Sequence, residues 1–169
     1  MNVVAIDEPD FQRLSFASQM IVWATRKRLH LLAQGDSELP VTEAFAKGGL
    51  TELHTALMSI VDVLLCGSSR RIQLHAVSCP CLSPHEISLL NALGFRQLGR
   101  IDDSRAALGE LFCRAAIGIV EPAVEFLVAE LDARRLRLTT IEASGHTPAA
   151  RSARSQARLS KPRRNATLH

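Results

Sequence analysis

The sequence has few aromatic side chains and no long apolar run. Its 169 residues include six phenylalanines, one tryptophan and no tyrosine, and these do not alternate with basic residues as a base-stacking surface requires. Charged residues such as Arg26, Glu52 and Arg114 interrupt every apolar stretch before it reaches the roughly 18 residues of a membrane span. The sequence therefore predicts neither a stacking platform for bases nor a transmembrane helix.

The sequence motifs of common enzyme classes are also missing. There is no Gly-x-Ser-x-Gly elbow for a nucleophile, no glycine loop that would cradle a phosphate and no dinucleotide-binding fingerprint. We interpret Asp102 and Asp103 as residues at a helix start. His30 and His54 border apolar stripes and are interpreted as packed or surface histidines. We therefore expect no catalytic set and no enzyme activity.

The N-terminal residues do not resemble a secretory signal. Met1–Val4 precede the acidic Asp7 and Glu8, which is the wrong charge order for a signal peptide. Four cysteines without such a signal are expected to be reduced thiols, and Cys66 and Cys113 are expected to be buried in apolar segments. Arginine outnumbers lysine 17 to 3, which we interpret as a GC-rich bacterial coding preference. We expect a cytoplasmic protein.

Apolar residues make up 47% of the chain and recur at helical spacing over its first 140 positions. The pattern predicts helices over about 15–34, 41–46 and 50–66, another that begins at Ser83, and a helical run over 104–136. That last run of 33 residues would form a rod of roughly 50 Å, which is too long for this body. We therefore expect Pro122 to split it near Val120-Glu121 or to kink it sharply.

The two halves of this run are each predicted to bury one apolar face. The first half is expected to bury Leu108, Leu111, Phe112, Ala115 and Ile119, and the second Val124, Leu127, Val128 and Leu131. Glu130 and Arg134 are expected to pair on the exposed side at i,i+4 spacing.

A single stretch departs from helical periodicity. Residues 71–77 alternate polar and apolar side chains, which is the period of a strand, but no partner strand is predicted elsewhere. The sequence therefore predicts an all-α fold, a compact bundle of five to six helices with an extended connection at about 70–83 and a disordered C-terminal tail. The expected divisions are an N-terminal arm over 1–14, a helical domain over 15–140 and a basic disordered tail over 141–169.

The strongest local signal lies at Ser83-Pro84-His85-Glu86. Ser83 can cap a helix, Pro84 suits its first position, and Glu86 can complete a capping box. With the preceding Leu82 and the following Ser88-Leu89-Leu90, these residues resemble the opening of the LuxR-type helix-turn-helix domain over about nine positions. Residues 96–105 lack the polar pattern of that family's later helices. We interpret the match as helix capping and transfer no DNA-contacting residue.

Four potential metal ligands lie close together near this helix start. His75, Cys79, Cys81 and His85 offer the imidazoles and thiolates that tetrahedral zinc takes, although Cys-Pro-Cys is tighter than the usual knuckle spacing. As an alternative, Cys79 and Cys81 precede a helix N-terminus, whose dipole favours the reactive thiolate and thus a redox role. A third interpretation is two small residues in a rigid connection.

Basic residues are concentrated in two places. Residues 143–169 carry six positive charges and no acid, at Arg151, Arg154, Arg158, Lys161, Arg163 and Arg164. The rest of the chain has 14 basic and 17 acidic residues, a net charge of −3. Arg26, Lys27, Arg28 and His30 form a predicted patch on the first helix. Together the patch and tail could hold phosphate, in salt-sensitive and sequence-independent contact with nucleic acid.

The leading hypothesis from the sequence is a non-catalytic regulatory or adaptor protein that binds another protein or itself. The amphipathic helices, the missing catalytic motifs and the charged tail support it. Trp23 is offset from the main apolar stripe of the first helix, so it either anchors a partner or widens the core. A homodimer is expected through the first helix or the last two helices. The alternatives are a thiol-redox or zinc-binding sensor and a nucleic-acid accessory protein.

Overall fold

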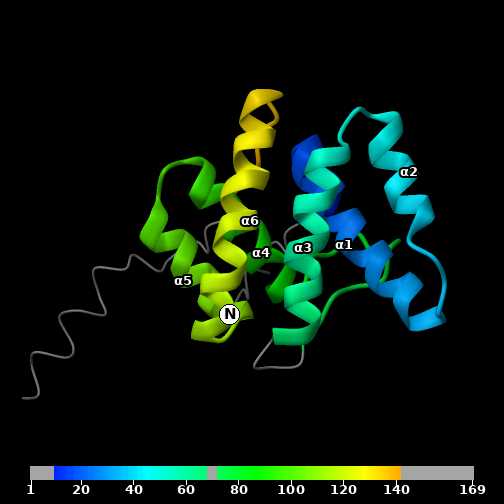
Figure 1. Cartoon of the computed structure of the whole chain (residues 1–169), viewed down its shortest axis with the longest axis horizontal. Coiled ribbons are helices and arrows are strands. Elements are labelled where there is room, and N and C mark those ends of the chain that lie inside the picture. Colours follow the sequence, from blue (N-terminus) through cyan, green and yellow to red (C-terminus); the bar gives the residue numbers. More distant parts are fainter. Residues whose placement is uncertain (1–9, 68–71, 142–169) are drawn as a thin grey trace, which may run out of the picture.

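Six α-helices and one short 3₁₀ helix are present in the described residues of the computed structural model, which are 10–67 and 72–141 (Figure 1). In chain order they are η1 Phe11–Arg13, α1 Phe16–Gln34, α2 Leu39–Lys47, α3 Thr51–Gly67, α4 Pro84–Gln97, α5 Ile101–Leu111 and α6 Arg114–Ala133. The prediction of an all-α bundle of five to six helices is confirmed. In these parts of the chain, no helix has the length and apolarity needed to cross a membrane.

Local capping residues set the ends of the best-predicted helices. The Ser15 side chain accepts a hydrogen bond from the Ser18 amide at the start of α1. Gly35 ends the helix in the left-handed conformation, with a φ of 74°, which glycine adopts without a steric penalty. The predicted helix over 15–34 is therefore confirmed. Ser83 caps α4 in the same way, with its side chain accepting from the Glu86 amide.

The helices pack in pairs around one apolar core. α3 and α6 lie side by side and antiparallel at the front of Figure 1, with α4 and α5 packed together beside and behind α6 and with α1 and α2 on the opposite side. Fully buried leucines, isoleucines and valines fill the centre, among them Leu53, Leu57 and Ile60 of α3, Leu89, Leu90 and Leu93 of α4, and Val120, Val124 and Leu127 of α6. Each such side chain contributes about 1.5–3 kcal/mol of hydrophobic stabilisation.

The break in the long helical run does not fall at Pro122. α5 ends at Leu111 and α6 begins at Arg114, so Phe112-Cys113 forms the turn and Pro122 lies inside α6. The predicted split near Val120-Glu121 is wrong. Gly118 and Pro122 are both exposed on the outer side of α6, so the proline ring does not displace any side chain of the core.

This shift of the break changes which residues are buried. Ala115 and Ile119 were predicted to be buried, but both are exposed, Ile119 to 67%. Cys66 and Cys113 are likewise exposed, because each lies at a helix end rather than on a core-facing stripe. The burial predicted for the second half, at Val124, Leu127, Val128 and Leu131, is confirmed, as is the pair between Glu130 and Arg134.

The predicted extended connection is confirmed over its described part, residues 72–83. No strand forms in the described residues, where the only β pairing is an isolated antiparallel bridge between Asp10 and Cys81. The Phe11 amide donates to the Pro80 carbonyl at 2.7 Å. The last residues of the predicted N-terminal arm therefore pack against the connection. Residues 1–9 of that arm and residues 142–169 of the predicted tail lie outside the described residues.

A segment after α6, residues 136–141, folds back across α4 and the start of α1. Asn91 donates to the Ile141 carbonyl at 2.9 Å and accepts from the Ile141 amide at 2.7 Å. The Thr139 amide donates to the Ser18 hydroxyl at 2.8 Å. These bonds join the C-terminal end of the helical domain to its first helix.

Gly94 provides the space in which this segment packs. A Cβ atom built at Gly94 would lie 2.6 Å from Thr140 Cγ2, well inside contact distance.

We expect Gly94→Ala to lower the free energy of unfolding by about 1–3 kcal/mol, because the added methyl displaces the segment over residues 136–141. Urea unfolding measures this change. Gly109→Ala is the matched control, because a Cβ there meets nothing within 4 Å. It should stabilise the protein by up to about 1 kcal/mol through helix propensity, and equal effects at both sites would contradict the expected clash.

Candidate functional site

Arg26 of α1 forms a buried ion pair with Glu86 of α4. The residue is only 2% exposed, and Glu86 only 1%. Arg26 Nε donates to Glu86 Oε1 at 2.7 Å, and Nη2 donates to Oε2 at 2.8 Å. This two-point geometry matches the planar guanidinium to the planar carboxylate, which makes it one of the stronger ion-pair arrangements in proteins.

The remaining guanidinium hydrogens bind the backbone of the connection over 72–83. Arg26 Nη1 donates to the Cys79 carbonyl at 2.6 Å and to the Ala76 carbonyl at 3.3 Å. Nη2 donates to the Cys81 carbonyl at 2.6 Å. All five N–H donors of the side chain are thus used. The Phe11 ring lies over the same guanidinium, with the Cζ atom 5.6 Å from the ring centroid.

Glu86 accepts four hydrogen bonds and also completes the predicted capping box. Its Oε2 accepts from the Ser83 amide at 2.8 Å, and the Ser83 hydroxyl accepts from the Glu86 amide at 3.2 Å. Its Oε1 accepts from the His75 amide at 3.1 Å. Burial alone would raise the pKa of Glu86, but the hydrogen bonds from Arg26, Ser83 and His75 outweigh burial and hold that pKa below its ordinary value. We call Arg26, Glu86 and the connection that they hold the Arg26 junction.

The junction removes Arg26 from the predicted basic patch on the first helix. A side chain that is 2% exposed and fully hydrogen-bonded cannot reach phosphate at the surface. Arg28 is also engaged, with Glu38 at 2.7 Å and Asp62 at 3.4 Å. Only the half-buried Lys27 and the exposed His30 remain of the patch. The tail arginines and lysine lie outside the described residues, so their contact with nucleic acid stays a prediction.

The four predicted metal ligands do not converge on one point. In the described parts of the chain, no group of three or more His, Cys, Asp or Glu side chains is arranged to hold a metal ion. His75 Nδ1 lies 3.7 Å from Cys79 Sγ and 3.0 Å from the Cys81 carbonyl oxygen. His85 Nδ1 instead accepts from the Gln73 amide at 3.1 Å. No disulfide joins any two of the four cysteines, all of which lie in the described residues, and a redox role for the pair stays a prediction.

An apolar pocket of about 340 Å³ lies between α1 and α2, next to the junction. It is lined by Phe11, Phe16, Gln19, Met20, Trp23, Ala44, Phe45, Gly48 and Leu50. Phe16 is 68% exposed, and Met20 and Trp23 are half-buried. Phe11 contacts both the pocket and the Arg26 guanidinium. Phe11 thus connects the pocket to the Arg26 junction.

Trp23 lines this pocket and also packs against the edge of the central core. Ala17, Ile21 and Ala24 of α1 face the core, whereas the offset positions Phe16, Met20 and Trp23 recur at i, i+4 and i+7 on another face of the helix. The sequence therefore carries a signal for two apolar faces on this helix. The pairing of the second face with α2 was not foreseen. The buried His54 packs its ring 5.3 Å from that of Phe45 behind the pocket, and burial lowers the pKa of His54.

Comparisons of this chain with models of protein families, with curated proteins and with solved structures give no match.

Proposed function

We propose that this chain is a non-catalytic adaptor or regulatory protein that binds an amphipathic helix of a partner protein in the pocket between α1 and α2. The observation that carries the proposal is the open apolar wall formed by Phe16, Met20 and Trp23. Apolar side chains left at the surface of a groove are typical of protein-binding sites. Methionine and tryptophan are enriched at such interfaces.

The lining of the pocket favours a helix over a small polar ligand. Small-molecule sites combine an apolar lining with a few polar groups that converge on the ligand. Apart from the indole N–H of Trp23, the only polar side chain among the lining residues is that of Gln19, and its amide already donates to the carbonyls of Gln12 and Leu14. A helix that presents apolar residues at i, i+3 or i+4 and i+7 requires no further polar group from the pocket.

Charged residues beside the pocket bear on which charges the partner helix carries. Lys27 lies one helical turn after Trp23, and Lys47, whose side chain is 81% exposed, directly precedes Gly48 of the pocket lining. The pairing of Lys47 with Glu43 is long, at 4.0 Å. Glu43, which directly precedes Ala44 of the lining, is also exposed, so the rim carries both signs of charge. We therefore infer that the partner helix carries charged residues of both signs beside its apolar face, because opposite charges at a rim direct orientation and association.

Photocrosslinking followed by a peptide titration tests this proposal. A photoreactive phenylalanine analogue is placed at position 16 of the full chain. On illumination it crosslinks to the segment of the partner protein that lies on the pocket, and this segment is then identified. A peptide of that segment should change the fluorescence of Trp23, the only tryptophan in the chain. Met20→Asp should weaken peptide binding at least about tenfold, because it places a charge in the apolar contact.

The matched control carries the same change at an exposed apolar residue outside the pocket. Leu98 is 62% exposed at the end of α4, and Leu98→Asp should leave the peptide affinity unchanged. The proposal is rejected if the crosslinked segments lack helical apolar spacing, or if Met20→Asp and Leu98→Asp bind the peptide equally well.

A further inference from the structure

A second apolar surface follows the outer side of α6, away from the core. Its members share exposure and the absence of charge, and they are Ala115, Gly118, Ile119, Pro122, Phe126, Ala129 and Ala133. We call this set the α6 stripe. Ile119 is 67% exposed and Phe126 47% exposed. On the opposite side of the same helix Val120, Val124 and Leu131 are fully buried, so the stripe plays no part in the core of its own chain.

The acidic residues beside the stripe are already paired within the chain. Glu121 binds Arg96 at 3.1 Å and Arg105 at 2.6 Å. Glu125, directly before Phe126, binds Arg96 at 3.2 Å. A partner of opposite charge is therefore not needed to neutralise this face, whereas an apolar partner fits it.

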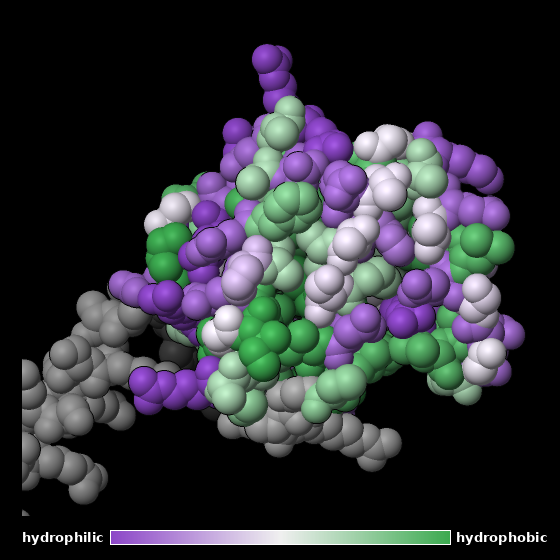
Figure 2. Space-filling model, in the orientation of Figure 1, coloured by the Kyte–Doolittle hydropathy of each residue, from purple (hydrophilic) through white to green (hydrophobic). Residues whose placement is uncertain are grey.

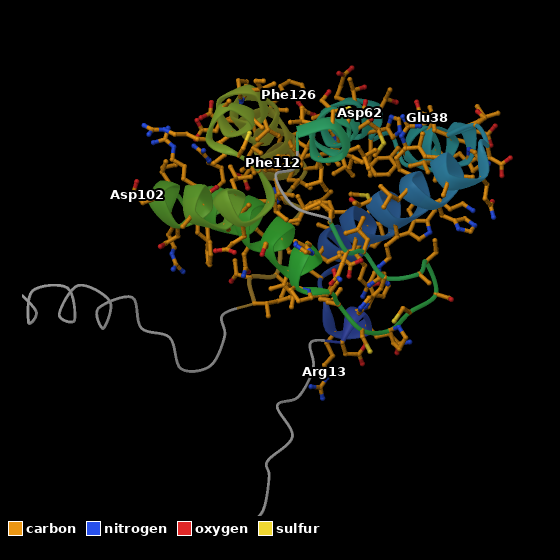
Figure 3. All side chains as sticks on the ribbon, turned by 90° about the horizontal axis from the view of Figure 1, so that it is seen from below. Arg13, Glu38, Asp62, Asp102, Phe112 and Phe126 are labelled. Atoms are coloured by element: carbon orange, nitrogen blue, oxygen red, sulfur yellow. The ribbon has the colours of Figure 1, made fainter. Side chains whose placement is uncertain are left out.

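The neighbouring face of α3 carries two exposed hydroxyl groups that are bonded within the helix and two exposed carboxylates, Glu52 and Asp62, of which Asp62 binds Arg28 at 3.4 Å. The hydroxyl of Thr55 donates to the Thr51 carbonyl at 3.2 Å, and that of Ser59 donates to the Thr55 carbonyl at 2.9 Å. Figure 2 shows apolar and weakly polar residues gathered over α6 and α3 in the middle of one face. In Figure 3 Phe126 of α6 and Asp62 of α3 lie on the same outer side. α3 and α6 thus present one continuous surface.

We propose that this surface binds a second copy of the chain, with the two α6 helices antiparallel and crossing near Pro122. A two-fold interface requires a patch that is complementary to itself. The stripe meets that requirement, because Gly118 and Phe126 lie four residues to either side of Pro122, and Ala115 and Ala129 lie seven residues to either side. The antiparallel arrangement brings the large Phe126 near the smallest residue, Gly118, of the other copy.

Gly118 fits this arrangement for a second reason. A Cβ atom at Gly118 would meet nothing within 4 Å, so packing inside the chain does not require a small residue there. Glycine in a helix interior is less favourable than alanine by about 1 kcal/mol. A second helix that approaches closely at this position supplies a reason for the missing side chain.

The surface has enough area for a specific dimer, but not enough for one of very high affinity. α6 has 20 residues and α3 has 17, which gives lengths of about 30 and 25 Å at 1.5 Å per residue. With neighbouring helices about 10 Å apart, the pair offers roughly 500–600 Å² per copy. The dimer would then bury about 1,000–1,200 Å² in total, near the lower limit for specific interfaces. We therefore expect association that depends on protein concentration.

Sedimentation velocity of the full chain over a wide concentration range tests the interface. The wild-type mass should rise from 18.5 kDa toward twice that value as the concentration increases. Phe126→Asp should keep the protein monomeric, whereas Phe16→Asp, the same change in the pocket between α1 and α2, should leave the dimer intact. A wild-type protein that stays monomeric throughout, or a dimer that Phe126→Asp does not weaken, overturns the proposal. Circular dichroism confirms that each variant retains its helices.

A disulfide crosslink tests the orientation of the two copies. Pro122→Cys is made in a chain in which the exposed Cys66 and Cys113 are replaced by serine. Because position 122 lies on the two-fold axis, mild oxidation should join two copies through the thiol at this position, whereas the half-buried Cys79 and Cys81 are also present in every control. Leu98→Cys in the same background should give no such product, and neither should the background itself. A dimer in which position 122 gives no more crosslink than position 98 overturns the antiparallel arrangement.

Discussion

Replacement of Arg26 by alanine is expected to lower the free energy of unfolding by about 3–5 kcal/mol, the largest effect of any substitution considered for this chain. Arg26 and Glu86 are almost fully buried, so the variant leaves a carboxylate without its partner in a low-dielectric site. It also removes the donors that hold the carbonyls of Cys79 and Cys81. A buried charge and buried carbonyls that lose their partners each cost free energy.

Urea unfolding measures the loss, and an exposed ion pair serves as the control. Arg137 binds Asp132 at 2.7 Å with its side chain 68% exposed, so Arg137→Ala should cost less than about 1 kcal/mol. Arg26→Lys keeps the charge but not the five donors, and it should lie between these two variants. If Arg26→Ala costs no more than Arg137→Ala, the junction does not hold the connection.

Thiol labelling under native conditions shows where the loss occurs. Cys79 and Cys81 are half-buried in the connection that Arg26 binds. In Arg26→Lys their labelling rate should increase, because the weakened junction opens the connection locally. The exposed Cys66 and Cys113 should react at their original rates. An unchanged rate at Cys79 and Cys81 would show that other contacts keep the connection in place.

Acidification is also expected to lower the free energy of unfolding strongly, because it protonates the carboxyl group of Glu86. Its pKa in the folded protein is lowered from the ordinary 4.5 because the hydrogen bonds of the junction outweigh burial. A lowered pKa means that the pair stabilises the fold fully above pH 4.5 and that this stabilisation is lost as the pH falls below 4.5 toward the folded-state pKa. The urea midpoint should therefore fall steeply below that pH.

Glu86→Gln identifies the contribution of this carboxyl group. The variant should be less stable than the wild type at neutral pH, and its midpoint should change less below pH 4.5 because the titrating group is missing. Glu121 also has a lowered pKa, mainly because of its hydrogen bond with Arg105, so it accounts for part of the slope that remains. If the wild type and Glu86→Gln lose stability in parallel, Glu86 is not the group responsible.

The sequence alone was sufficient for features that depend on neighbouring residues. Ser15 and Gly35 mark the ends of α1, and Ser83 and Glu86 form the capping box of α4, because helix ends are satisfied by side chains within a few positions. The extended connection at about 70–83 was also predicted from the sequence, because the alternation of polar and apolar side chains over 71–77 is a local pattern. The same locality explains the all-α fold, which follows from helical periodicity in every other segment.

Features that depend on distant contacts were decided only by the tertiary structure. Arg26 is 60 positions away from Glu86, and nothing in its basic neighbours distinguishes a buried arginine from a surface one. The same holds for Phe16, Met20 and Trp23, whose second apolar face became a pocket only when α2 packed beside it. Helical spacing determines which residues share a face, but the other helices determine whether that face is covered, half-covered as at the pocket, or left open as on α6.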